Sequence, residues 1–221
     1  TSTYGRAMNP APGEPAAWID EDVRPVPKNI YGVTKTAAED LCELAQQRTG
    51  MPCLVLRTSR FFPEADDDGD LRERWDDANL KANEFLFRRV DVADAVDAHL
   101  CAIEAATRVW FGRYVISATT PFERGDSPAL GLDAPAVLAR RVPGYVEAYA
   151  ARGWRMFGAL DRVYDNARAR ADLGWRPRYD FAHVLARLAA GEAPISPLAR
   201  TIGAKGYHDE TFEDGPYPVA C

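Results

Sequence analysis

The sequence contains no apolar run long enough to cross a bilayer, and its first residues have neither the charged nor the apolar region of a signal peptide. It also has no surplus of basic residues: 27 lysines and arginines stand against 33 acidic residues, a formal net charge of -6. Such a chain has no positive field to hold phosphate backbones or anionic lipid. Neither nucleic acid nor membrane is therefore expected as a partner, and a cytoplasmic location is predicted.

Cysteine and histidine are scarce and do not form a metal-binding pattern. The four cysteines include no Cys-x-x-Cys pair, and three of them lie in apolar periodic segments, where a reduced thiol behaves as a small hydrophobic side chain. The three histidines have no ligand-like spacing to one another or to the cysteines. The acidic run 64–70 imitates half of a calcium loop, but Trp75 stands where a bidentate Glu is required. No metal site is predicted.

With 221 residues, 47% of them hydrophobic, the chain is able to bury a core and to form one domain or one domain with an appended lobe. It opens on Thr-Ser-Thr-Tyr-Gly, without an initiator Met and without a preceding helix or strand. This beginning leads us to expect a piece of a longer protein.

Apolar periodicity predicts a helix followed by a buried strand. The helix begins after Asn29, a suitable N-cap, and runs to about residue 49, with an apolar face formed by Ala37, Ala38, Leu41, Leu44 and Ala45. Gly50 and Pro52 end it, and the apolar run 53–58 is typical of a parallel strand buried on both faces. A second helix over 91–105 and a strand at 114–117 repeat the pattern.

The rest of the chain is divided by Pro and Gly. Residues 6–28 are predicted to be a surface loop, and short helices are predicted around 134–141, 144–152, 165–173 and 179–190. We predict the C-terminal part of a dinucleotide-binding domain at 1–59, a substrate-loop insertion at 60–90, a return to the first domain at 91–118, a small lobe at 119–190 and an irregular tail at 191–221.

Tyr31 and Lys35 are the strongest candidates for chemistry. Their spacing of four residues puts them on one face of the predicted helix, near its beginning. A tyrosine is a poor base at neutral pH, but an adjacent cation favours its phenolate. The spacing alone also arises by chance, so the surrounding residues decide the interpretation.

Several segments around this pair match a known pattern in order and distance. They are Tyr4-Gly5, a Pro-rich loop, residues 27–39 (Pro-Lys-Asn-Ile-Tyr-Gly-Val-Thr-Lys-Thr-Ala-Ala-Glu), Leu56-Arg57, residues 92–99 (Val-Ala-Asp-Ala-Val-Asp-Ala-His) and residues 169–177 (Ala-Arg-Ala-Asp-Leu-Gly-Trp-Arg-Pro). Together they resemble the extended short-chain dehydrogenase/reductase superfamily and its NAD-dependent epimerase/dehydratase family.

The resemblance implies an α/β fold: the C-terminal part of a Rossmann-like doubly wound parallel sheet plus a small, mostly helical substrate lobe. It implies NAD or NADP as cofactor, with NAD favoured, and a small-molecule substrate such as a sugar nucleotide. Tyr31 would exchange a proton with a substrate oxygen, and Lys35 would also bind the nicotinamide ribose. A homodimer through the helix that begins at Asn29 is implied as well.

Further site residues follow from the same resemblance. Thr1 is the candidate for the third catalytic group, a hydroxyl that hydrogen-bonds the reacting oxygen. Cofactor binding is assigned to Tyr31, Lys35, Arg60 and Phe61. For substrate binding the candidates are Arg60, Phe62, Arg88 and Arg89, since guanidinium groups fit phosphate or carboxylate groups bidentately, although solvated surface charges are an equal alternative for the arginines.

Three departures from the family pattern limit the assignment. Arg60 stands where epimerases and reductases of the family often have Asn, which weakens the sugar-nucleotide assignment. The glycine-rich dinucleotide loop is absent, so activity is expected to require a preceding part of the protein. The Asp-Glu pair of the family's dehydratases is replaced by Thr1-Ser2, which disfavours dehydration. An epimerase or a net oxidoreductase is therefore predicted, and the alternative is a non-catalytic dinucleotide sensor of the same fold.

Overall fold

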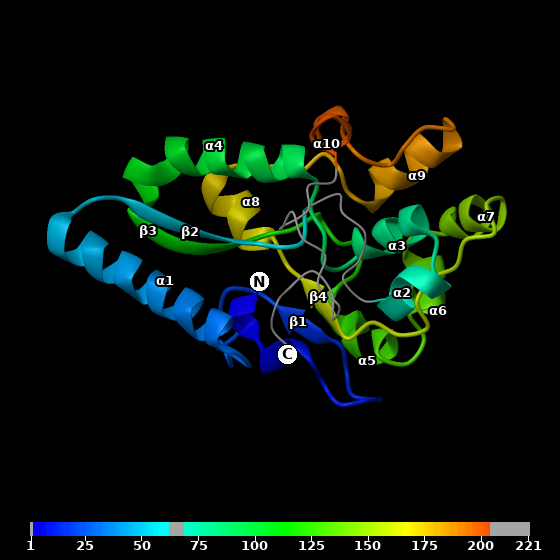
Figure 1. The fold of residues 1–221 in the computed structure, drawn as a ribbon, viewed down its shortest axis with the longest axis horizontal. Coiled ribbons are helices and arrows are strands. Elements are labelled where there is room, and N and C mark those ends of the chain that lie inside the picture. Colours follow the sequence, from blue (N-terminus) through cyan, green and yellow to red (C-terminus); the bar gives the residue numbers. More distant parts are fainter. Residues whose placement is uncertain (1, 62–68, 204–221) are drawn as a thin grey trace.

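A computed structural model of the protein describes residues 2–61 and 69–203. Helices and two small parallel sheets make up an α/β fold, as the sequence predicts (Figure 1). One sheet pairs β2 (Cys53–Thr58) with β3 (Phe111–Ile116), and the other pairs β1 (Ala17–Ile19) with β4 (Arg162–Tyr164). Within the described ranges, no helix has the length and apolar character needed to span a membrane.

The first long helix, α1 (Ile30–Thr49), begins and ends where the sequence predicts. The Asn29 side chain accepts a hydrogen bond from the backbone N–H of Gly32 at 2.9 Å, which satisfies a donor that the helix leaves unpaired. At the other end Gly50 adopts a left-handed conformation with φ 69°, and its N–H bonds to the Gln46 carbonyl. The two caps fix where α1 lies along the chain.

Helices cover both faces of the β2–β3 sheet. Helix α4 (Val92–Val109) and helix α8 (Ala167–Leu173) lie on one side of it and α1 lies on the other (Figure 1). Leu54 and Leu56 of β2 pack on the α4 side, whereas Arg57 points toward α1 and binds Glu39 there. Because helices cover both faces of the sheet, apolar residues stand at successive positions in the run that predicts the strand.

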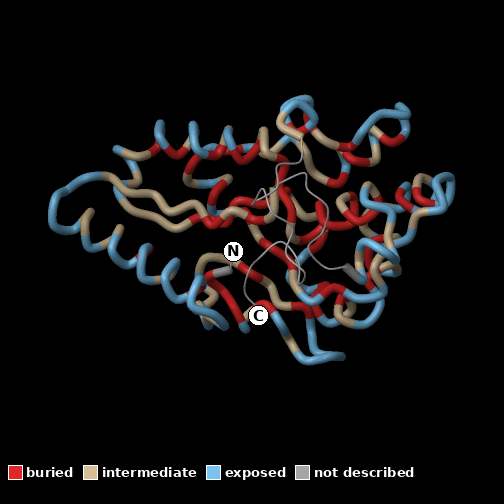
Figure 2. Tube along the Cα trace, viewed as in Figure 1, coloured by how far each residue is buried: buried red, intermediate tan, exposed pale blue. Residues whose placement is uncertain are grey.

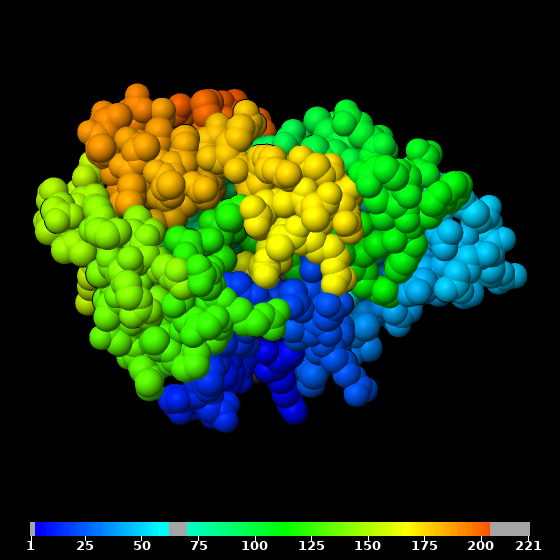
Figure 3. All heavy atoms as spheres, turned by 180° about the vertical axis from the view of Figure 1, so that it is seen from behind, coloured from blue at the N-terminus to red at the C-terminus, as the bar shows by residue number. Residues whose placement is uncertain are grey.

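The core between α4, α8 and β3 is centred on Trp175, whose side chain is fully buried. Its indole Nε1 donates a hydrogen bond to the Asp94 carbonyl oxygen at 3.1 Å. Seen from behind, α8 and the segment after it lie beside α4 (Figure 3). The motif that includes Trp175 therefore serves to pack this segment onto the sheet.

The second half of the chain forms the predicted small helices. All four agree closely with prediction: α6 (Ala134–Arg141), α7 (Tyr145–Ala150), α8 (Ala167–Leu173) and α9 (Phe181–Ala189). Elements that were not predicted are the strands β1 and β4, the helices α2 (Gly69–Arg74), α3 (Asp77–Glu84), α5 (Ser127–Leu130) and α10 (Pro197–Ile202), and the single-turn helices η1 (Ser2–Tyr4), η2 (Arg6–Met8) and η3 (Arg124–Asp126). The predicted domain boundaries stay a prediction.

The apolar face predicted for α1 is largely exposed. Leu41 is 64% and Leu44 46% exposed, and Figure 2 shows most of the helix at the surface. The buried residues of α1 are Gly32 and Glu39. Because Glu39 binds arginines of the sheet, ion pairs and not the leucines decide which side of α1 faces inward.

Two carboxylates at the start of α4 hold the C-terminal segments against this helix. Asp94, which is fully buried, accepts the backbone N–H groups of Arg178 at 3.0 Å and Tyr179 at 2.8 Å. Asp91 accepts the N–H of Ser196 at 2.9 Å. Burial raises the pKa of Asp94 to about 6, and the charge of Asp91 acts in the same direction.

We expect this shift to make stability depend on pH. Because the folded state binds the Asp94 proton more tightly than the unfolded chain, the stabilisation is fully present below about pH 4 and is lost as the pH rises through about 6. Between about pH 4 and pH 7 the wild type should lose roughly 2 to 3 kcal/mol of unfolding free energy that Asp94→Asn does not lose. Urea unfolding of both proteins tests this, and parallel pH curves would contradict it.

Candidate functional site

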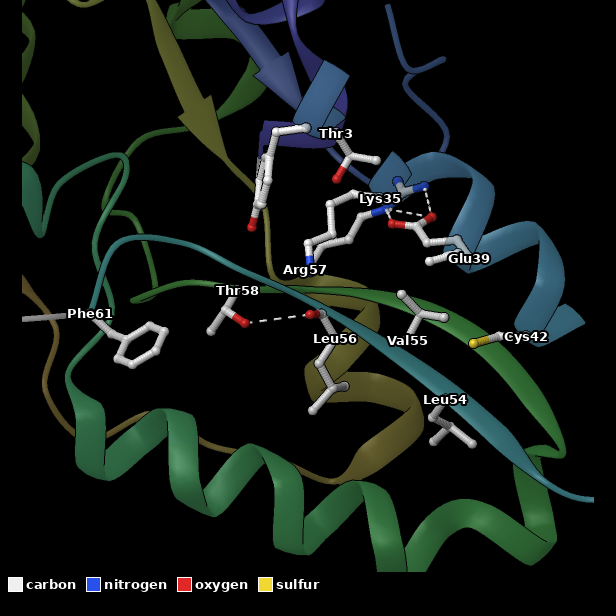
Figure 4. Close-up of a pocket in the computed structure, with 12 residues that line it drawn as sticks. Thr3, Lys35, Glu39, Cys42, Leu54, Val55, Leu56, Arg57, Thr58 and Phe61 are labelled. Carbon is white, nitrogen blue, oxygen red and sulfur yellow. Dashed lines mark hydrogen bonds and ion pairs between the residues drawn. The ribbon is translucent and has the colours of Figure 1, made fainter. Parts of the chain in front are cut away.

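A cavity of about 440 Å³ lies between α1 and β2. The side chains of Lys35, Glu39 and Cys42 enter its wall from α1, and Thr58 and Phe61 lie at the far end of β2 (Figure 4). The complete lining is Thr3, Tyr31, Lys35, Ala38, Glu39, Cys42, Leu54, Val55, Leu56, Arg57, Thr58 and Phe61. The cavity thus follows the strand along its length, and its volume is in the range of small-molecule sites.

Tyr31 and Lys35 line this cavity together. The Lys35 ammonium lies 5.3 Å from the centre of the Tyr31 ring, and both residues are exposed. They occupy the first turns of α1, whose start is fixed by the Asn29 cap. A phenol and a cation are therefore presented side by side at an accessible surface, which is the arrangement that acid/base chemistry by a tyrosine needs.

A buried ion pair attaches α1 to the sheet directly below this pair. The Arg57 guanidinium binds both oxygens of Glu39, with Nη2 to Oε2 at 2.7 Å and Nε to Oε1 at 3.1 Å. Arg57 also donates through Nη1 to the Tyr4 hydroxyl at 2.9 Å, and that hydroxyl donates to the Asp20 carbonyl at 2.8 Å. The two charged side chains are 4% and 9% exposed, so the pair is shielded from water.

The hydrogen bonds and burial of this network determine the protonation states of Arg57 and Tyr4. Burial favours loss of the Arg57 proton, but the hydrogen bonds to Glu39 and Tyr4 outweigh it, so the pKa of Arg57 lies above its usual value. Burial raises the pKa of Tyr4, against the influence of Arg57. Arg57 therefore stays a cation, and Tyr4 stays a neutral phenol that both accepts and donates a hydrogen bond.

The three arginines predicted to bind substrate gather around one carboxylate. Glu84 is 1% exposed and lies 2.7 Å from Arg89, 2.8 Å from Arg88 and 3.5 Å from Arg60. Glu84 was not among the predicted site residues, although its position four residues before Arg88 is a spacing at which side chains meet on a helix. Three guanidinium groups thus share Glu84 as a common partner.

The remaining predicted residues fall into three groups. Phe61 lines the cavity with Tyr31 and Lys35, whereas Arg60, Arg88 and Arg89 are not among its lining residues. Thr1 and Phe62 lie outside the described residues. Thr3, which is buried, places a threonine in the cavity wall two positions after the predicted Thr1. A sequence search for a hydroxyl next to Tyr4 would have included it.

Searches found no family model that matches the chain and no match among curated proteins. Among solved structures, UDP-N-acetylglucosamine 4-epimerase from Bacillus cereus matches 86% of this chain and 59% of its own, with 18% identity and a TM-score of 0.48. UDP-glucuronic acid 4-epimerase from Bacillus cereus in complex with NAD matches 84% and 54%, with 16% identity and a TM-score of 0.46.

Both of these matches are to UDP-sugar 4-epimerases. A third structure, RMD from Pseudomonas aeruginosa complexed with NADPH, matches 86% of this chain at 20% identity, with a TM-score of 0.47. The chain spans 62% of the length of that protein and 54 to 59% of the two epimerases.

Proposed function

We propose that the chain supplies the acid/base part of an NAD(P)-dependent active site of the extended short-chain dehydrogenase/reductase type. The activity is that of an epimerase or oxidoreductase acting on a secondary alcohol or carbonyl carbon, including that of a sugar nucleotide. The observation that carries this proposal is the presence of Tyr31 and Lys35 one helical turn apart in the wall of one cavity. The complete activity is that of the whole protein, to whose active site this chain contributes Tyr31 and Lys35.

Tyr31 acts on the proton of the substrate oxygen. As a phenolate it accepts the hydroxyl proton during oxidation, and as a phenol it returns a proton to the carbonyl oxygen during reduction. The positive charge of the Lys35 side chain stabilises the negative phenolate. The buried Thr3 hydroxyl in the same wall is a further candidate donor to the substrate oxygen.

The cavity suits a nicotinamide dinucleotide by the chemistry of its donors. The Tyr31 hydroxyl and the Lys35 ammonium are donors for ribose hydroxyls, and the Phe61 ring offers an apolar surface to the nicotinamide. Arg60, next to Phe61, is the proposed cation for a phosphate. When bound, the cofactor supplies hydride transfer, and NAD is the favoured form.

We further propose a cytoplasmic homodimer that acts on a small-molecule substrate. Support for the dimer comes from α1, where Ile30 is 82% and Val33 56% exposed in line with Leu41 and Leu44. Apolar residues at this helical spacing form a continuous stripe, which a second copy would cover. For an anionic substrate group the proposed contacts are Arg60, Phe62, Arg88 and Arg89, and the guanidinium groups of the three arginines lie together around Glu84.

The test is dinucleotide binding by the whole protein, with its preceding part, purified without added cofactor. Acid extraction should release NAD or NADP, which mass spectrometry identifies, and retained NAD would favour the epimerase.

Lys35→Met should weaken NADH binding by roughly tenfold, because a charge-assisted hydrogen bond is lost. Nicotinamide fluorescence measures the binding. Lys81→Met, which removes a lysine paired with Asp77 on α3, is the matched control. A protein that retains no dinucleotide and binds none on titration would refute the enzyme.

A further inference from the structure

The carboxylates of α1 are all placed after Lys35. From Ile30 to Ala38 the helix has Lys35 as its only charged residue, and Glu39, Asp40 and Glu43 follow. Glu39 stands four residues after Lys35, a spacing at which oppositely charged side chains form an ion pair on a helix surface. Tyr31, Lys35 and Glu39 thus lie in a row on one face of α1. The Lys35 ammonium lies between the Tyr31 phenol and the Glu39 carboxylate and could pair with either.

An ion pair with Glu39 would weaken the effect of Lys35 on Tyr31. The field of an isolated charge falls with distance, whereas a carboxylate in contact with the ammonium cancels most of that field a few ångströms away. The phenolate of Tyr31 would then gain little from a cation whose charge is already balanced. For the proposed chemistry, Glu39 has to be held elsewhere.

The structure shows where Glu39 is held. Arg57 binds both of its oxygens, and Arg113 donates through Nε to Oε2 at 3.1 Å. Arg113 also binds Asp40 at 3.2 Å and Glu43 at 2.9 Å, so each of the three acidic side chains of α1 has an arginine partner from β2 or β3. Figure 4 shows the Arg57–Glu39 contact next to Lys35.

Arg57 is itself fixed in place. Its guanidinium lies 4.8 Å from the centre of the Tyr4 ring and donates to the Tyr4 hydroxyl, which in turn is bound to the Asp20 carbonyl. A planar guanidinium held on one side by Tyr4 presents its remaining N–H groups in a rigid fork, which matches a carboxylate. Arg57 therefore cannot follow Glu39 toward Lys35.

We propose that Arg57 is a positioning residue that sequesters Glu39 and so leaves the Lys35 ammonium to act on Tyr31. This inference rests on the proposed function, because it concerns the effect of the Lys35 ammonium on Tyr31 as the acid/base group. Arg113 gives the same carboxylate a second partner. Tyr4 serves as the support that keeps Arg57 in register with Glu39.

The experiment measures ionisation of the Tyr31 phenol directly in the 221-residue chain. Tyrosine labelled with ¹³C at the ring ζ carbon reports the phenolate, and Tyr31→Phe identifies the Tyr31 signal. In Arg57→Met, Glu39 keeps only its contact with Arg113 and is able to turn toward Lys35, so the pH of half-ionisation should rise by roughly one unit. Adding Glu39→Gln to this variant should return the midpoint to the wild-type value, because no carboxylate remains to occupy Lys35.

Arg57→Lys is the matched control for charge. It keeps the positive charge but loses the fork, so one oxygen of Glu39 is released and we expect a rise of about half that size. An unchanged midpoint in Arg57→Lys, or a double variant that fails to recover, would overturn the proposal. If Arg57→Met does not fold, Arg113→Met, whose side chain is 24% exposed, replaces it with a smaller expected rise.

The outcome is independent of dinucleotide binding. If the whole protein, with its preceding part, binds no dinucleotide but the midpoints are as expected, the proposed enzyme is refuted and the role of Arg57 is kept. A chain that binds dinucleotide but has the same midpoint in every variant refutes only the role of Arg57.

Discussion

Tyr31→Phe is expected to lower kcat of the dinucleotide-loaded protein by roughly 10²- to 10⁴-fold, the usual contribution of a positioned acid/base group. The ring stays in the cavity wall, and only the hydroxyl that exchanges the proton is removed. Substrate and cofactor contacts made by the ring persist, so KM should change much less than kcat. Steady-state kinetics with a secondary alcohol substrate, followed through NADH absorbance or product analysis, provide the measurement.

Tyr145→Phe is the matched control for Tyr31→Phe. Its hydroxyl donates to the Pro135 carbonyl at 3.2 Å in the helical lobe, and the residue is not part of the cavity lining. We expect activity close to that of the wild type. If Tyr31→Phe retains wild-type turnover, Tyr31 is not the acid/base group, whatever its position beside Lys35.

The helices and strands that were predicted well are those with a strong local signal. The strand at 53–58 and the helix that follows Asn29 were both predicted with the bounds seen in β2 and α1, because a cap, a glycine stop and an apolar run mark them. The helix at 91–105 extends to Val109 in α4. Each of these signals lies within a few residues of the element that it defines.

Pairing between distant segments was missed for the opposite reason. Strands β1 and β4 have three residues each, and their register joins Ala17 to Arg162. Three residues are too few to show an alternation, and the stabilising partner is more than a hundred positions away. The prediction of a loop over 6–28 was wrong at β1 because no local pattern carries this contact.

In the candidate site, too, the local contacts were predicted and the contacts between distant segments were not. The spacing of Tyr31 and Lys35 is a property of one helix, so the sequence alone places them side by side. The partners of Glu39 are Arg57 on β2 and Arg113 on β3, and the cluster around Glu84 joins α3 to the segment around Arg60. Such contacts form only once the helices and strands have packed. For the same reason the prediction put Leu41 and Leu44 on the inward face of α1, where the structure has Glu39 and its ion pairs.

Trp175→Ala is expected to cost about 3 to 5 kcal/mol of unfolding free energy, the largest stability effect that we predict. The indole is fully buried among Ala95, Ala98 and Ile116, and its removal leaves a cavity between α4, α8 and the sheet. The Asp94 carbonyl also loses its donor. Urea unfolding followed by circular dichroism gives the free energy, and thermal unfolding should begin at a clearly lower temperature.

Two further variants separate the effect of the cavity from that of the hydrogen bond. Trp175→Phe keeps most of the ring volume and loses the N–H donor, so it should cost less than half as much as Trp175→Ala. Trp110→Ala removes an indole that is 48% exposed, and its cost should stay well below that of either change at Trp175. If Trp110→Ala and Trp175→Ala cost the same, then Trp175 does not hold the C-terminal segment against α4 and the sheet. If only Trp175→Ala is costly, the filled volume beneath α4 is what keeps that segment in place.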